Sequence, residues 1–221
     1  MTSNLSKVDL NTLRVFKELF LNPGRGQTYH DLCDWAKVNG QSRLENLSKE
    51  SAKEKDETEA EFNRLCIGPY KLVVIPYENA WRGQGKAING RIAADVADFY
   101  ASAGLSSNSS LNEYPDFFGN ELEFIYFLEA LREEESKKGN FKLVKQIDDL
   151  QNAFREEHFD LWYRPFLEKL AAETRLEFWK EVSEVLCRCL QKEKSQKNSG
   201  TSSPSSLKEE EKDIRTNYKN Q

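Results

Sequence analysis

The sequence has none of the residue patterns on which most enzymes depend. It contains no GxxxxGK[ST] phosphate loop, no HExxH metal motif and no GxSxG nucleophile turn. It has only two histidines, and His158 has no His or Cys neighbours at zinc-site spacing, so a capping or packed histidine beside Trp162 is the simpler interpretation. Gly83, Gly85 and Lys86 form a lone GxGK, which favours a flexible turn over a nucleotide site. These absences predict a protein that is not an enzyme and that carries no metal or cofactor.

Disulfide and membrane signals are also missing. The four cysteines, at positions 33, 66, 187 and 189, show no CxxC spacing, which is typical of reduced thiols in a cytosolic protein. No run approaches the roughly 18 apolar residues that span a membrane, and the first residues lack the apolar core of a secretory signal. We therefore expect a cytoplasmic protein without a membrane span.

Charge is plentiful, but it does not have the sign that nucleic acids attract. The chain has 32 Lys and Arg against 37 Asp and Glu, a net charge of −5. Residues 191–221 hold seven of the basic and five of the acidic residues and almost no large apolar ones, so we predict a disordered tail there and a more acidic body before it. Such a body does not favour nucleic acid. It suits a basic peptide partner, although acidic compositions are also common without one.

Most of the remaining sequence has the apolar spacing of amphipathic helices. Helices are predicted over about 10–22, 28–39, 62–67, 90–103, 117–138, 141–156, 158–172 and 175–191, with a charged helix or loop over 41–58. The helix that follows Pro115, which Asp116 can cap, is apolar around more than half of its circumference, so we place it at the centre. We predict an all-α fold: a single-domain helical bundle over residues 1–190, with a Ser/Asn-rich linker at 105–113, followed by the disordered tail at 191–221.

One stretch does not fit the helical pattern. Residues 61–81, EFNRLCIGPYKLVVIPYENAW, contain two prolines, two tyrosines and a tryptophan around the short apolar run 72–75. Proline interrupts helices and stiffens the backbone, so this stretch could form a preformed surface for another chain. It could equally be a long loop whose aromatic side chains complete the core of the domain.

Four motifs of this chain resemble those of the TorD/DmsD/NarJ-type chaperones, which proofread twin-arginine signal peptides of molybdenum oxidoreductases. They are Phe62-Asn63-Arg64-Leu65 with Gly68-Pro69, Pro76-Tyr77-Glu78 leading to Trp81, Pro115-Asp116 before Glu121-Leu122-Glu123-Phe124, and His158-x-x-x-Trp162-x-x-x-Phe166. The resemblance runs from about residue 8 to 190. It implies an all-helical, non-enzymatic cytoplasmic chaperone that holds the signal peptide and the apo-form of a reductase subunit until the molybdenum cofactor is inserted, before export.

The resemblance also implies a set of residues that bind the peptide: Leu65, Cys66, Pro76, Tyr77, Glu78, Trp81, Pro115, Asp116 and Phe117. The sequence departs from the family pattern in two places. Phe117 stands where relatives often have a histidine, and Cys66 stands where they often have a larger apolar residue, which would widen the groove. Relatives are monomers or domain-swapped dimers, and the linker at 105–113 would permit the swap. The residues alone leave a second hypothesis open, a helical adaptor that binds folded partners; a nucleotide hydrolase fits least, because a phosphate loop is missing.

Overall fold

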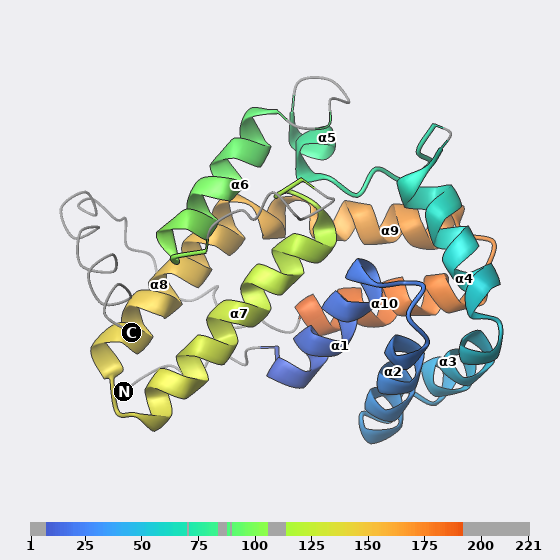
Figure 1. Cartoon of the computed structure of the whole chain (residues 1–221), viewed down its shortest axis with the longest axis horizontal. Coiled ribbons are helices and arrows are strands. Elements are labelled where there is room, and N and C mark those ends of the chain that lie inside the picture. The colour runs from blue at the N-terminus through green and yellow to red at the C-terminus, as the bar shows by residue number, and fades with distance from the viewer. Residues whose placement is uncertain (1–7, 70, 84–87, 89, 106–113, 192–221) are drawn as a thin grey trace.

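The structure, a computed structural model, describes residues 8–69, 71–83, 88, 90–105 and 114–191. Most of the predicted linker, residues 106–113, and the predicted disordered tail from 192 onward lie outside these ranges. Tyr70, Glu113 and the Gly85-Lys86 part of the GxGK also lie outside them. The linker, the tail and the turn therefore stay predictions. Figure 1 shows the described part as a bundle of helices that cross one another at several angles.

Helices form all the regular secondary structure of the described residues, which confirms the predicted all-α bundle. The α-helices are α1 (Leu10–Leu21), α2 (Gly26–Val38), α3 (Ser42–Lys53), α4 (Lys55–Phe62), α5 (Glu78–Arg82), α6 (Arg91–Ser102), α7 (Phe118–Lys137), α8 (Phe141–Glu157), α9 (Tyr163–Glu173) and α10 (Glu177–Gln191). A π-helix, η1 (Asn63–Ile67), follows α4, and a 3-10 turn, η2 (Phe159–Leu161), precedes α9. None of the helices in the described ranges has the length and apolarity that crossing a bilayer requires.

Helix α7 is central, as its wide apolar surface predicts. It packs between α1 and α8, and Figure 1 shows it running diagonally through the middle of the bundle. At its start, the ring of Phe118 packs against Phe20 of α1 and stacks on Phe159. Farther along, Phe124 packs edge-on against Phe154 of α8. These buried rings join the two halves of the bundle and hold the start of α7 in a fixed place.

The helix that begins at α4 ends where Gly68 and Pro69 predict it should. In η1 the N–H of Gly68 donates to the carbonyl of Asn63, five residues back, so the helix widens before it stops. Gly68 has a φ of 105° and a ψ of −170°, a conformation that is accessible almost only to glycine. The described residues between this helix end and α5, which are 68, 69 and 71–77, are non-helical.

The structure corrects several predicted helix starts: the helix predicted from 62 begins with α4 at Lys55, and the helix predicted from 158 begins with α9 at Tyr163. Asp116 does not cap α7: Phe117 occupies the N-cap position, with no side-chain cap. The Asp116 carboxylate instead accepts a hydrogen bond from the N–H of Asn79 in α5, because a β-bridge between Tyr77 and Phe117 places Asp116 opposite the start of that helix. Helix α2 begins at Gly26, one half-turn before the predicted start.

Candidate functional site

A pocket of about 520 Å³ opens beside the irregular stretch. Its size lies within the roughly 300–1,000 Å³ range of ligand-binding pockets. The described lining comes from the segment 71–75, from α5, from residue 88 in the chain beyond α5, and from α9. Among the described residues it consists of Lys71, Leu72, Val73, Ile75, Ala80, Trp81, Ile88 and Lys169, and of these all but the two lysines are apolar. An apolar cavity of this kind suits the side chains of a hydrophobic peptide segment.

The backbone carbonyl of Leu65 holds the wall formed by 71–75 in place. Pro69 leaves this carbonyl without the N–H that would bond to it in an α-helix. Within a helix the carbonyl of Leu65 would accept from the N–H four residues later, but that residue is Pro69, which has none. The carbonyl accepts instead from the N–H groups of Val73 and Val74, at 3.0 and 2.9 Å. The sequence thus ends a helix and, with the same proline, ties the pocket wall to that helix end.

Trp81 forms the opposite side of the pocket and is also held at both edges. Its indole N–H donates to the carbonyl of Ile75 at 2.7 Å, which joins α5 to the wall. Its ring lies edge-on to Phe166 of α9, with centroids 6.4 Å apart. Because Trp81 remains half-buried, part of its ring faces the pocket, while its polar atom is satisfied.

The structure places the nine predicted peptide-binding residues close together but mostly in the interior. Trp81 lines the pocket, and Pro115 is half-buried. The other seven are buried: Leu65, Cys66, Pro76, Tyr77, Glu78, Asp116 and Phe117. Cys66 therefore does not widen the described pocket, and its burial raises the pKa of its thiol. Direct contact between these buried side chains and a peptide stays a prediction; what they visibly do is position the pocket.

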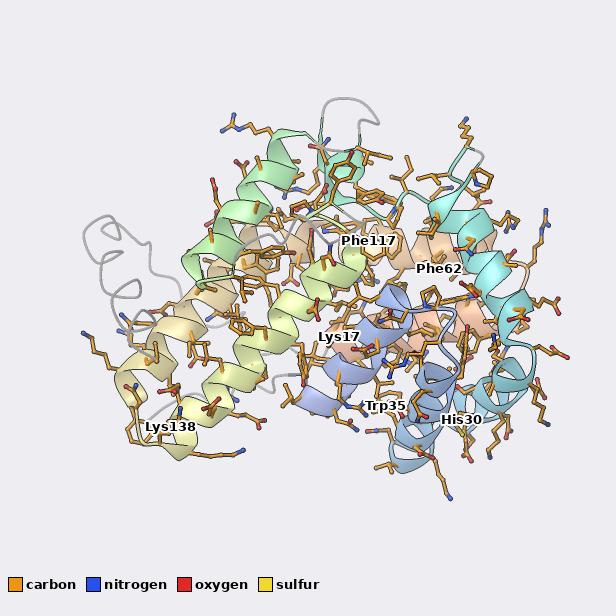
Figure 2. The ribbon with its side chains drawn as sticks, viewed as in Figure 1. Lys17, His30, Trp35, Phe62, Phe117 and Lys138 are labelled. Atoms are coloured by element: carbon orange, nitrogen blue, oxygen red, sulfur yellow. The ribbon has the colours of Figure 1, made fainter. Side chains whose placement is uncertain are left out.

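The Pro76 and Pro115 motifs meet through backbone and ring contacts. Tyr77 and Phe117 form the antiparallel β-bridge, and the N–H of Phe118 donates to the carbonyl of Pro76 at 2.9 Å. The ring of Tyr77 lies 5.7 Å from that of Phe117 and 5.9 Å from that of Tyr114. Figure 2 labels Phe117 at the start of α7, where its side chain is directed into the molecule. This junction attaches α5, and with it the pocket, to the central helix.

Three fully buried carboxyl groups lie close to one another, those of Glu78, Asp116 and Glu121. Glu78 interacts through one oxygen with Nδ1 of His158, at 2.9 Å, and through the other with Arg82. The indole N–H of Trp162 donates to Oε2 of Glu121 at 2.9 Å. The other oxygens of Asp116 and Glu121, Oδ1 and Oε1, have no hydrogen-bond partner within the described part of the chain.

Burial and mutual repulsion raise the pKa values of two of these groups. Burial first, and then the charge of Glu78, raises the pKa of Glu121 well above its ordinary value of 4.5. Burial also raises the pKa of Asp116 above 3.8, with a smaller contribution from Glu78, while the hydrogen bond from the N–H of Asn79 opposes the rise. A protonated carboxyl group carries no charge into the core, so both groups are easier to bury when neutral.

The structure also answers the sequence-based questions about metal ligands and His158. Among the described residues, no group of three or more His, Cys, Asp and Glu side chains could hold a metal ion. His158, predicted to pack beside Trp162, is stacked on Phe154 and bound to Glu78. The sequence indicated the apolar run 72–75, but the pocket residues Ile88 and Lys169 carry no local signal, because only the tertiary fold brings them there.

Comparison with known proteins gives a consistent result. The sequence model of the nitrate reductase delta subunit family matches residues 21–168. The chaperone protein TorD of Vibrio parahaemolyticus is 25% identical over 132 residues, which are 59% of this chain and 59% of that protein. A crystal structure of a redox enzyme maturation protein from Archaeoglobus fulgidus superposes with a TM-score of 0.58 at 18% identity. That match covers 86% of this chain and 99% of the other, and it shows that the two share a fold.

Proposed function

This chain belongs to the nitrate reductase delta subunit family, and from that membership we propose that it is a maturation chaperone for a redox enzyme and not itself an enzyme. In finer terms, it binds the twin-arginine signal peptide of a molybdenum oxidoreductase catalytic subunit. It acts in the cytoplasm, where it holds the apo-subunit while the molybdenum cofactor is inserted, and so delays export. The likeness to the TorD chaperone supports this reading, although this chain spans only 59% of the length of that relative.

The observation that carries the proposal is the apolar pocket between the segment 71–75 and Trp81. A signal peptide combines a pair of arginines with a hydrophobic segment, and the hydrophobic segment needs an apolar surface to leave water. The pocket offers one on a wall that is already fixed by the Leu65 carbonyl and by the Trp81–Ile75 hydrogen bond. A preformed wall lowers the entropic cost of binding a flexible peptide.

The charges around the pocket indicate which part of the peptide enters it. Lys71 and Lys169 are exposed at the pocket, and Lys169 also pairs with Glu173. Two cations at the pocket disfavour a nearby arginine and leave an uncharged apolar segment as the better occupant. The arginine pair must then lie beside the pocket and not inside it.

Titration of a labelled signal peptide tests the proposal. Three peptides are needed: the twin-arginine sequence, the same peptide with both arginines changed to lysine, and one whose hydrophobic segment is replaced by serine. We expect saturable binding of the first, weaker binding of the second and none of the third, because the pocket recognises the apolar segment. If all three fail to bind while a folded reductase subunit is captured, the protein is instead an adaptor for folded partners.

A further inference from the structure

Arg82 lies next to the pocket and joins two acceptors at the surface. It follows Trp81 directly in α5, and Figure 1 shows this short helix at the edge of the bundle. Its guanidinium group contacts Oε1 of Glu78 and donates to the carbonyl of Glu157 at 2.7 Å. Glu157 is the last residue of α8, where the helix dipole concentrates partial negative charge. A buried carboxylate and a helix end thus form one receptor for a planar cation.

Two further buried carboxyl groups lie close to Glu78. Asp116 and Glu121 lie behind Glu78, each fully buried and each with one oxygen that lacks a hydrogen-bond partner in the described residues. Burial first, and then the charge of Glu78, raises the pKa values of Asp116 and Glu121. Arg82 contacts Oε1 of Glu78, and its side chain is 28% exposed. Solvent therefore reaches the Arg82 side of the Arg82–Glu78 ion pair, and another cation can approach it from there.

We propose that Glu78 and the terminal carbonyl of α8 form a site for an arginine side chain of the bound peptide, and that Arg82 occupies this site in the free protein. The inference rests on the proposed function, since it assigns a place to one arginine of the signal peptide. In the peptide the arginines adjoin the apolar segment; in the protein, Trp81 lines the apolar pocket and the next residue covers the carboxylate. The arginine and the apolar segment are therefore neighbours in the peptide, as the carboxylate and the apolar pocket are in the protein.

The weaker hydration of a guanidinium group gives a preference for arginine over lysine. One nitrogen of Arg82, Nη1, contacts Oε1 of Glu78 and donates to the carbonyl of Glu157. A lysine ammonium is a compact, strongly hydrated point charge, so more hydration is lost when it is brought against a buried carboxylate. Because Arg82 already satisfies the site, a guest arginine must displace it, and the internal contact lowers the affinity for the peptide.

Replacing Arg82 tests the exchange, and the chain offers a matched control. Arg132 pairs with the buried Glu129, and its side chain is 26% exposed, but it lies on α7 and does not line the pocket. The twin-arginine peptide and its double-lysine form are titrated against the parent protein, Arg82→Gln and Arg132→Gln. We expect Arg82→Gln to bind the arginine peptide about three- to tenfold tighter, with little change for the lysine peptide, because one partly exposed charged contact has been freed. Arg132→Gln should bind both peptides as the parent does.

The deciding quantity is the affinity for the twin-arginine peptide divided by the affinity for the double-lysine peptide. If this ratio is no higher for a folded Arg82→Gln protein than for the parent, the proposal is wrong. If that variant fails to fold, Arg82→Lys decides, since it keeps a charge beside Glu78 but a more strongly hydrated one, and its arginine-to-lysine ratio should also exceed that of the parent. A measurement without peptide separates the two proposals: millimolar guanidinium chloride, compared with equal sodium chloride, should raise the melting temperature of the Arg82 variant but not that of the parent. If the parent binds neither peptide, the signal-peptide function fails, and the guanidinium measurement alone decides whether the site exists.

Discussion

The carboxylate of Asp116 accepts a hydrogen bond at 2.9 Å from the backbone N–H of Asn79, a residue 37 positions earlier in the chain. This bond crosses from the loop before α7 to the first turn of α5, where a free N–H would otherwise be buried without a partner. The backbone adds a second link, because the N–H of Glu78 donates to the carbonyl of Asp116 at 3.0 Å. Asp116 therefore holds the helix that carries Trp81 and Arg82, and it acts on the pocket without lining it.

Asp116→Ala should cost about 1–2 kcal/mol of unfolding free energy, because it removes the side-chain cap of α5. Asp116→Asn should cost less, since the amide oxygen can still accept from the N–H of Asn79. Urea denaturation of both variants measures the difference. Peptide affinity should follow the same order, because loosening α5 moves Trp81. Equal stability of the two variants would show that the cap contributes nothing.

Glu121 should make the fold less stable as the pH rises. Its pKa is raised in the folded state, so its favourable contribution is fully present below the unfolded value of about 4.5 and is lost as the pH rises through the folded value. Glu121→Gln keeps an acceptor for the Trp162 indole and removes this titration. The stability of the variant relative to the parent, measured by urea midpoint, should therefore be greater at pH 8 than at pH 5. A trend of opposite sign for Glu121→Gln would contradict the assignment.

Phe124→Ala should destabilise the fold by about 3–5 kcal/mol, since large-to-small changes in a packed core leave a cavity. The ring is buried and lies 4.7 Å from that of Tyr100 and 4.8 Å from that of Phe154. It thereby joins α6, α7 and α8. Phe141 is the matched control, because its side chain is 72% exposed at the start of α8 and its loss should change stability little. Thermal melts of the two alanine variants give the comparison.

The helices could be predicted because their signals are local. The wide apolar surface of α7 predicted a central helix, and Gly68 with Pro69 predicted the end of η1. The role of Asp116 could not be found this way. An aspartate after a proline and before an apolar helix looks like an N-cap, and only the β-bridge between Tyr77 and Phe117 turns it toward another helix.

The sequence indicated which part of the chain would lie near the candidate site, but not which side chains would line it. The motifs drew attention to residues 61–81, beside which the pocket lies, yet the sequence does not reveal which rings face inward. Tyr77 and Trp81 look alike as aromatic residues near Pro76, but one is buried against Phe117 and the other lines the pocket. That distinction depends on contacts with α7 and α9, which are distant in the chain.

Trp81→Ala and Tyr77→Ala should therefore act on different properties. Loss of the Trp81 ring removes an apolar wall of the pocket and should weaken binding of the signal peptide by at least about tenfold, as aromatic residues at the centre of interfaces often do. Tyr77 is only 7% exposed and packs against Tyr114 and Phe117, so its removal should mainly lower stability, by about 3 kcal/mol.

Trp81→Phe provides the control for that prediction, because it keeps an aromatic wall but removes the indole N–H that holds the carbonyl of Ile75. Its affinity should lie between those of the parent and Trp81→Ala if the fixed wall matters as well as its apolar surface. Circular dichroism melts and peptide titrations on all three variants separate folding from binding. Should Trp81→Ala bind the peptide as tightly as the parent while remaining folded, the pocket is not where the hydrophobic segment docks, and the peptide must use another face of the bundle.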